Sequence, residues 1–553
     1  MRKTILITTS AATLVFLFSI SYLSIFGFKT DNFNVFINNI VKEYNPKLNI
    51  KLDDVFIKLN LSQGSININT KDSILNSENN ILKISNIDTN LNIIKFIKNE
   101  NAIKNIKIET SENSIKDVTS LFNSINYDLS RYLFYSQIKK GSIKFKLDTE
   151  FDISNPKIYS YKISGFVKDA KLNLISKGSL DSINFNFEAT DELTNISKLN
   201  FYYQSLNLLS ESIEIKKETS DTYLFKGDIQ NNKSLIDPNI LFKLLKIKQD
   251  LLSNKEISIQ SKNFFSFRLN KLKKLENIKI DSIINFDEIY FSKKYQNLIF
   301  LKEGIINSKY ENNQFIADFK SNFDFSEDLK IKNEYRNNIL KFSLNSKNNQ
   351  NIRISGSISN EKTLLDPNVL LKLLDIDTNL IFDNNVNIKT DNQFKFEVND
   401  SKIESYLINS TLYLEKLEFR KQIQDIIYFK NIKTKITLGD KLLKLDLKSN
   451  FSFFDDKINI ESEKNILNLK LNNTNSKISD VEIFLQGDNN NISTKEFKKY
   501  FNFQKGIIKN QIINLNSNFL INFSIDETFN IKNLALKSDL NLDNLDINYK
   551  SNL

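Results

Sequence analysis

The side chains that could carry chemistry in this chain are carboxylates, hydroxyls and amines. Its 553 residues include no His and no Cys, which excludes an imidazole base, a thiolate nucleophile, a disulfide and a His or Cys metal site. Only 11 Gly and 4 Pro are present, so a Gly-rich phosphate-binding loop is not expected. These absences exclude most familiar enzyme classes.

Oxygen-ligated cation sites and carboxylate pairs are the remaining options. Asp455–Asp456 and Asp488–Asn491 gather acidic and amide side chains. Neither follows the acidic spacing, with a central Gly, of an EF-hand calcium loop. The carboxylate pair of a glycosidase is defined by its separation in space, which the sequence does not provide. We therefore expect solvated turns at both places, no metal, no cofactor and no enzymatic activity.

The charge balance is basic but evenly spread. Lys and Arg number 76 against 66 Asp and Glu, a net charge of +10. The basic residues are interspersed with acids and form no Arg cluster or stripe, so the pattern predicts a solvated surface and not a nucleic-acid partner.

The amino terminus contains one long uncharged segment, Thr4–Phe28. As a helix it is long enough to cross the ~30 Å hydrocarbon core of a bilayer. The cationic residues Met1–Lys3 precede it, so the positive-inside rule places the amino terminus in the cytoplasm and translocates the rest. The alternative is a cleaved signal peptide, for which Ser19–Ser21 is a poor cleavage site. We expect a retained single-pass anchor in a bacterial inner membrane, with the bulk of the chain periplasmic.

Beyond the anchor, apolar and polar residues alternate. Four of the runs are Ile143–Leu147, Leu443–Leu447, Leu467–Leu471 and Phe519–Ile525. A period of two predicts strands that are wet on one face, and such strands pair mostly antiparallel. The fold prediction is therefore mainly β: a transmembrane helix, then a long, curled antiparallel sheet that forms an open groove.

An internal repeat interrupts the strands. Gly227–Ile247 matches Gly356–Ile376 at 13 of 21 positions, with an offset of 129 residues. Each copy contains an Asp-Pro pair, Asp237–Pro238 or Asp366–Pro367, in which the Asp is suited to a helix N-cap and the Pro to the first helical position. The apolar residues that follow fall on one stripe, so we expect a short amphipathic helix packed against the sheet. The residues expected to be covered include Leu244 and Leu373.

The repeats predict the domain organisation. Weaker copies at Ser114–Ile125 and Ile492–Phe503 suggest an array of β units that bury surface against their neighbours. The alternation still runs at Leu540–Tyr549, so we expect the chain to be a fragment or its last strand to pair with something else. The predicted boundaries are 1–3 for a cytoplasmic tip, 4–28 for the anchor, 29–110 for an amino-terminal region, 111–233, 234–362 and 363–491 for three β repeat units, and 492–553 for a partial fourth.

The apolar face has two interpretations. In a closed sandwich it is core, whereas in an open trough it can hold acyl chains. No second set of strands differs in pattern to form an opposing sheet, which favours the trough. Burial of each CH₂ gains about 0.8 kcal/mol, so a lipid tail could enter the trough at little net cost. The residues expected to line it are Phe145, Leu147, Phe185, Phe187, Leu445, Leu447, Phe451, Leu469 and Phe523.

A further pattern follows the anchor, in the stretches Asn45–Ile50, Leu82–Ile87, Leu91–Ile97 and Ile103–Ile108. In this order, over residues 1–110, they resemble the start of AsmA-like proteins, a family within the bridge-like lipid transfer proteins. The repeats after them look most like the YhdP and TamB types of that group. The resemblance implies an inner-membrane anchor and a periplasmic β-groove that carries glycerophospholipid toward the outer membrane, in outer-membrane biogenesis.

The expected partners are therefore phospholipid, the inner membrane and possible outer-membrane components. The alternative is a membrane-tethered structural or assembly protein, a β-repeat array that binds protein partners and not lipid.

Overall fold

The computed structural model describes most of the chain. The described residues are 2–547 without 78–79, 99, 101, 126–135, 153–154, 156–158, 175–177, 205, 220, 240–251, 254–255, 273, 293–298, 326–336, 348–350, 366–385, 400–401, 418–426, 454–464, 474–477, 495–507, 527–529 and 544. Asp366, Leu373 and Asp455–Asp456 therefore lie outside the described residues, as does Leu244.

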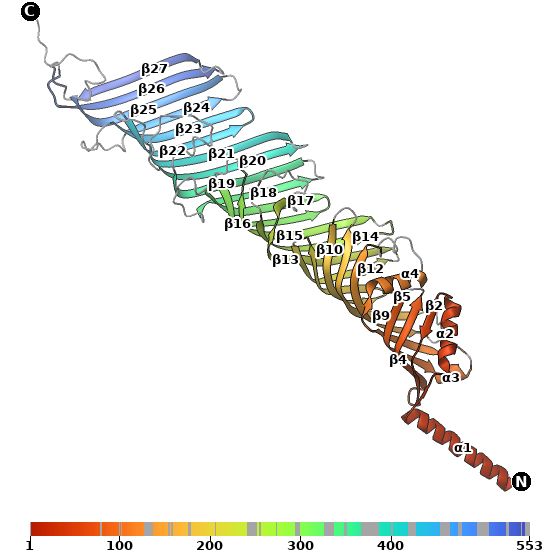
Figure 1. Ribbon diagram of the computed structural model, residues 1–553. Coiled ribbons are helices and arrows are strands. Elements are labelled where there is room, and N and C mark those ends of the chain that lie inside the picture. Colours follow the sequence, from red (N-terminus) through yellow and green to blue (C-terminus); the bar gives the residue numbers. More distant parts are fainter. Residues whose placement is uncertain are drawn as a thin grey trace, which may run out of the picture. The chain divides into compact units, whose positions relative to one another are not determined.

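The described strands, 27 in number, belong to one antiparallel sheet (Figure 1). The mainly β fold predicted from the alternation is thereby confirmed, and all four of the runs quoted for it lie within strands. The described helices are α1 (Arg2–Ile25), α2 (Phe33–Tyr44), α3 (Ile93–Ile97) and α4 (Ile115–Ile125).

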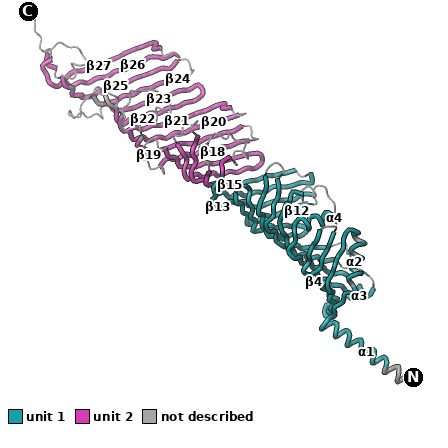
Figure 2. Tube along the Cα trace, viewed as in Figure 1, with its two compact units in different colours: residues 1–236, 260–281 teal, residues 237–259, 282–553 magenta. Residues whose placement is uncertain are grey.

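The chain divides into two compact units, residues 1–236 with 260–281 and residues 237–259 with 282–553 (Figure 2). The boundary passes through β14 (Ile257–Leu269) and β15 (Leu275–Tyr290). The predicted boundaries of the repeat units differ from this division and stay a prediction.

The first unit contains the strands that precede β14. Strand β4 pairs with both β2 and β3 along one edge and with β5 along the other, and β3 also pairs with β1. From β8 to β13 each strand pairs with the next. The strands are β1 (Phe28–Thr30), β2 (Leu48–Lys51), β3 (Val55–Asn60), β4 (Ser65–Ser77), β5 (Asn80–Asn92), β6 (Ile103–Thr110), β7 (Asn113–Ser114), β8 (Ile138–Phe151), β9 (Tyr159–Leu174), β10 (Gly178–Thr190), β11 (Leu193–Tyr203), β12 (Leu206–Thr219) and β13 (Thr222–Ile236).

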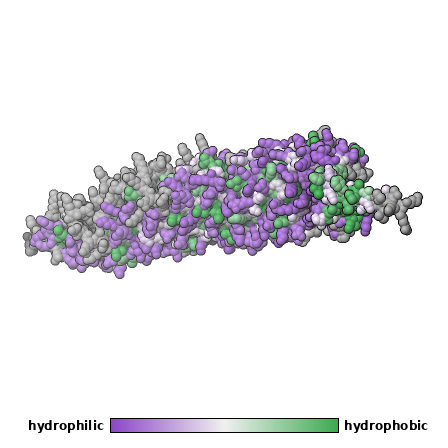
Figure 3. Space-filling view, turned by 90° about the horizontal axis from the view of Figure 1, so that it is seen from below, coloured by the Kyte–Doolittle hydropathy of each residue, from purple (hydrophilic) through white to green (hydrophobic). Residues whose placement is uncertain are grey.

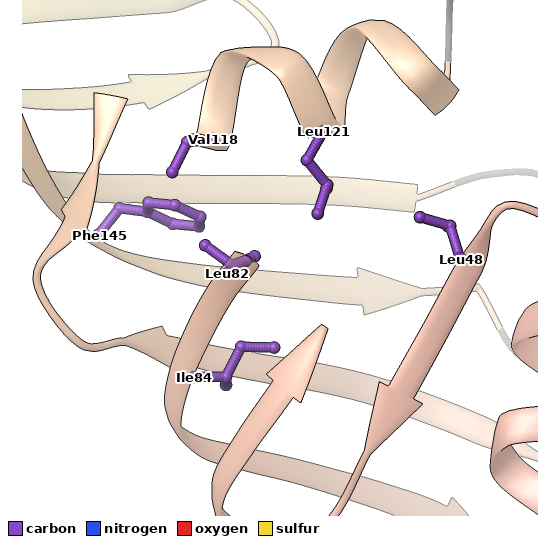
Figure 4. Close-up of a cluster of buried hydrophobic side chains, with 6 residues drawn as sticks. All are labelled: Leu48, Leu82, Ile84, Val118, Leu121 and Phe145. Atoms are coloured by element: carbon purple, nitrogen blue, oxygen red, sulfur yellow. The ribbon is translucent and has the colours of Figure 1, made fainter. Parts of the chain in front are cut away.

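Helix α4 packs on the apolar face of this unit (Figure 4). Val118 and Leu121 point from the helix toward Leu82 of β5 and Phe145 of β8, and all four side chains are buried. The helix thus braces the sheet, at the place of the weaker repeat copy at 114–125. The same arrangement is predicted for the helices that follow Asp237–Pro238 and Asp366–Pro367, whose apolar residues Leu244 and Leu373 lie outside the described residues.

The second unit is a meander in which each strand pairs with the next from β16 to β27. Its strands are β16 (Ile299–Glu311), β17 (Gln314–Phe325), β18 (Ile339–Lys347), β19 (Asn351–Leu365), β20 (Val386–Asn399), β21 (Lys402–Leu417), β22 (Ile427–Gly439), β23 (Leu442–Phe453), β24 (Ile466–Asn473), β25 (Ile478–Ser493), β26 (Ile512–Asp526) and β27 (Ile531–Asp543).

Where the alternation of apolar and polar residues shifts by one position, a single residue in the left-handed backbone conformation keeps the apolar side chains on one face. In β22 the apolar positions are odd up to Phe429 and even from Ile432, and the register shifts between Lys430 and Lys433. Asn431, at the shift, has φ +49°. Because Asn tolerates this conformation better than most residues, the extra residue forms a bulge and the apolar side chains stay on one face.

A hydrogen-bond network near the end of β13 anchors it to β14. Asn231 is buried, and its Oδ1 accepts from Ser261 Oγ at 2.5 Å. Asn263 Nδ2 donates to Ile229 O at 2.9 Å and to Ser261 Oγ at 3.1 Å.

The same network recurs in the second unit, between β19 and β20, at the repeat offset of 129 residues. Thr390 Oγ1 donates to Asn360 Oδ1, and Asn392 Nδ2 donates to Ile358 O at 3.0 Å and to Thr390 Oγ1 at 3.2 Å. The sequence repeat is therefore also a repeat of hydrogen bonds. In the first copy a helix begins at Pro238, and Asp237 Oδ1 accepts from Asn239 N at 2.8 Å, which confirms the predicted N-cap.

Helix α1 contains a segment, Thr8–Ile25, that is long and apolar enough to cross a membrane, and none of it is buried within the protein. Helix α1 ends at Ile25, and Gly27, two residues later, has a φ of +66°, which is typical of the glycine that follows a helix. A Cβ there would lie 2.6 Å from the Phe56 ring and 2.7 Å from Ile57 O, so glycine is required where the helix meets β3.

We expect Leu121→Ala to lower the free energy of unfolding by about 2–5 kcal/mol, because the substitution leaves a cavity between α4 and the sheet. The adjacent Phe122 is 49% exposed, so Phe122→Ala should change stability by no more than about 0.5 kcal/mol. Urea-induced loss of the β-sheet circular-dichroism signal measures both. Equal losses from the two variants would show that α4 does not brace the sheet.

Candidate functional site

The apolar face of the second unit is built from rows of side chains that lie opposite one another on successive strands. In the first row, Leu447 of β23 lies opposite Leu469 of β24, which lies opposite Ile483 of β25. The row continues through Ile521 of β26 to Leu536 of β27. We call this the Leu447 row. It brings two of the predicted residues, Leu447 and Leu469, into direct cross-strand contact distance.

A second row, the Leu445 row, lies beside the first. Leu445 of β23 is opposite Ile436 of β22 on one side and Leu471 of β24 on the other. Val481 of β25 and Phe523 of β26 extend it. Because Leu445 and Leu447 are two residues apart in one strand, the two rows share a face. The predicted residues Leu445 and Phe523 are thus on the same surface as Leu447 and Leu469.

A third row contains the aromatic residues of the earlier strands. Phe319 of β17 stacks on Phe342 of β18, with ring centroids 4.6 Å apart. Phe342 lies opposite Gly356 of β19, and Gly356 lies opposite Phe394 of β20. From Phe394 the row runs through Ile408, Leu438 and Leu443, the last being two residues before Leu445. All three rows therefore belong to one face, which we call the apolar face.

Gly356 has no side chain, which leaves room for the rings of Phe342 and Phe394 on the two flanking strands. A Cβ at this position would lie 2.3 Å from Lys341 O, 2.5 Å from Phe342 Cβ and 2.7 Å from Phe394 Cζ. Gly165 has the same role in the first unit, where it lies opposite both Phe145 and Phe187. Glycine is thus used where two aromatic rings meet across a strand.

The remaining predicted residues lie in more closely packed surroundings. Phe145 is 6% exposed beneath α4, and Leu147 packs against the same cluster. Phe185 and Phe187 lie on one face of β10, with ring centroids 6.2 Å apart, and Phe187 also contacts the α4 cluster. Phe451 is 2% exposed and lies opposite Phe429. Contact of any of the nine residues with lipid stays a prediction.

Exposure of the apolar face differs along the second unit. Leu445, Leu447, Leu469 and Phe523 are half-buried. Leu534 and Leu536 of β27 are 65% and 64% exposed. Apolar side chains in this number are unusual on a solvated surface and commonly mark a contact surface.

The opposite face of the same strands is polar and charged. Lys470 of β24 lies opposite Glu482 of β25, with Nζ 2.8 Å from Oε1. This hydrogen bond raises the pKa of Lys470 above its usual value. In the first unit Arg268 forms a two-pronged pair with Glu218, at 2.7 and 3.1 Å, which lowers the pKa of that carboxyl. The solvated face is therefore held by charge pairs while the other face is apolar.

The expected solvated turn at Asp488–Asn491 was wrong. These residues lie in β25, at a register shift between Gly487 and Asn490, and the Asn490 side chain is fully buried. Its amide exchanges two hydrogen bonds with that of the buried Asn465, at 2.6 and 2.8 Å. The polar group is buried without cost because its partner satisfies it, a condition that local composition does not reveal.

Among the described residues no group of three or more Asp or Glu is arranged to hold a metal ion. On the face seen in Figure 3, hydrophobic residues are scattered among hydrophilic ones and gather into one patch over α1. The arrangement provides an apolar surface suited to contact.

Comparison of the chain with protein-family models, with curated proteins and with solved structures finds no match.

We expect Gly356→Ala to lower stability by about 1–3 kcal/mol, because its Cβ would collide with the backbone of β18 and with two rings. The control is Gly439→Ala, whose Cβ would have its nearest contacts at 3.3 and 3.7 Å and should change stability by no more than about 1 kcal/mol. Urea unfolding compares them. A neutral Gly356→Ala would mean that the aromatic row is not tightly packed.

Proposed function

We propose that this protein is a non-enzymatic lipid conduit, held in a membrane by α1, in which glycerophospholipid moves along the apolar face of the sheet. The acyl chains lie on the apolar rows and the headgroups stay in water. The chain's own residues supply a surface and no chemistry.

The continuity of the apolar rows is the observation that carries this proposal. The Leu447 row crosses five strands without a charged residue. A slip of one residue at any pairing would move a charged residue such as Lys448 onto this face. A row that formed only a local core would tolerate a charged residue on one of its strands. An acyl chain that moves from strand to strand would contact the side chain at every position of the row, so each of them has to be uncharged.

The energetics suit transfer. About 0.8 kcal/mol is gained for each CH₂ removed from water, whether the surroundings are a bilayer or protein. Since both surroundings are apolar, the free energies nearly cancel, and lipid can pass between them without an energy source.

The resemblance of residues 1–110 to AsmA-like proteins supports the direction of this proposal. It suggests an inner membrane for α1, a periplasmic location for the sheet and an outer-membrane destination for the lipid. Arg2 and Lys3, which precede the uncharged segment, support an orientation with the amino terminus in the cytoplasm.

A structural or assembly protein remains the second candidate, and the last strand favours it. Ile531, Leu534, Leu536 and Leu540 of β27 are each more than half exposed, with values of 59%, 65%, 64% and 56%. Apolar side chains this exposed are suited to contact with a protein partner.

The anchor predicts an uncut amino terminus. Mass spectrometry of protein from the membrane fraction should find Thr4–Phe28 still attached, because the segment is longer than the apolar region of a signal peptide. Recovery of soluble protein alone, starting near Tyr22, would contradict the anchor.

The conduit predicts that one charge on the apolar face interrupts lipid contact. Leu447→Asp should reduce photo-crosslinking of phospholipid, by about tenfold, to probes placed on either side of it. One probe is at Ile483 of the Leu447 row, and the other is at Leu412 of β21, which is in line with Leu447 across Thr434 of β22. The physical reason is that the acyl chain would have to desolvate an unpaired carboxylate.

The matched control is Lys448→Asp, a larger change of charge at the next residue, whose side chain is exposed on the polar face. It should leave crosslinking unchanged. A folded Leu447→Asp protein with unaltered crosslinking and transfer would remove the conduit and leave the structural candidate.

A further inference from the structure

Helix α3 exposes an unusual amount of apolar surface for its length. Ile94, Phe96 and Ile97 are 65%, 53% and 76% exposed, three of the five residues of the helix. The helix is nevertheless a defined element, because Asn92 Oδ1 caps it by accepting from Lys95 N at 3.1 Å. The apolar side chains are therefore presented to the surroundings by ordered backbone.

The position of α3 follows from the strand register. Asn92 lies opposite Ser65 at the start of β4, and Ile93 N donates to Gly64 O at 3.1 Å. The helix thus lies beside the turn that joins β3 to β4. Leu61, in that turn, is 56% exposed, so exposed apolar side chains are present in both of these neighbouring elements.

Helix α1 leaves the first unit at this same end. In the antiparallel pair of β1 and β3, Phe28 lies opposite Ile57 and Thr30 opposite Val55. Because the two strands are antiparallel, the chain that precedes Phe28 lies toward Asn60, the last residue of β3, and the turn after it. Figure 1 shows the end of α1 and α3 at one end of the unit.

Several basic residues lie in or next to these two elements. Lys58 and Lys98 are exposed, and Lys104 Nζ donates to Gln63 O at 3.3 Å. Glu100 is the exposed acid beside α3. Apolar residues flanked by Lys are suited to the interface of a bilayer, where the ammonium groups reach phosphate while the apolar groups enter the acyl region.

We propose that α3 and the Leu61 turn form a membrane-contact patch that inserts into the bilayer leaflet at which α1 ends. Its apolar side chains would enter about 5–10 Å into the boundary between headgroups and acyl chains, and the patch would fix the first strands of the sheet at the bilayer surface, where lipid enters. This inference rests on the proposed membrane insertion of α1.

The test uses the absence of native Trp. Phe96→Trp in the full chain, reconstituted in vesicles of phosphatidylcholine and phosphatidylglycerol brominated near the top of the acyl chains, should lose about half or more of its emission relative to unbrominated vesicles. Ile97→Trp gives a second probe should Phe96→Trp fail to fold.

Two controls separate this inference from the anchor. Phe16→Trp lies near the middle of α1 and should be quenched in matching vesicles whose lipids are brominated near the ends of the acyl chains. Tyr202→Trp, on the opposite side of β11 from the buried Phe201, should not be. Quenching at 16 but at neither 96 nor 97 would overturn the membrane-contact patch and leave the anchor and conduit. Absence of quenching at both places would overturn the anchor itself, and quenching at 202 equal to that at 96 would show that contact is not confined to the patch.

Discussion

Side chains alternate between the two faces of every strand, so the hydrogen-bonding register of each pair decides whether one face of the sheet is apolar. In the second unit this register aligns Leu447, Leu469, Ile483 and Ile521 over four strands. The charge pairs, such as Lys470 with Glu482, then fall on the opposite face. The division into an apolar and a solvated surface thus follows from backbone pairing, and the proposed function depends on it.

Asn has a structural use that follows from the same constraint. Where the alternation slips by one residue, the chain must absorb the extra residue, and Asn431 and Asn489 do so with φ of +49° and +51°. Buried Asn side chains such as Asn360 then satisfy the hydrogen bonds that the irregular backbone leaves. In a chain with only 11 Gly, Asn therefore supplies both the left-handed conformation and the hydrogen bonds.

The strands, the amino-terminal helix and the helix start at Pro238 could be predicted because each leaves a local pattern: period two, a long uncharged segment and an Asp-Pro pair. The paired rows could not be predicted from the sequence, because they depend on which residue of one strand lies opposite which residue of the next. The burial of Asn490 was missed for a related reason: its partner, Asn465, is distant in sequence and lies directly before the neighbouring strand β24. Phe145 and Leu447 have the same sequence pattern, and only the structure distinguishes the residue under α4 from the half-buried one.

The central claim is that acyl chains occupy the apolar face, and an electron cryomicroscopy map of the full chain in a lipid nanodisc tests it most directly. The account predicts elongated, unbranched density along the Leu445 and Leu447 rows, in van der Waals contact with Leu469 and Phe523. A map in which protein segments cover these rows, with no lipid density between, would contradict it.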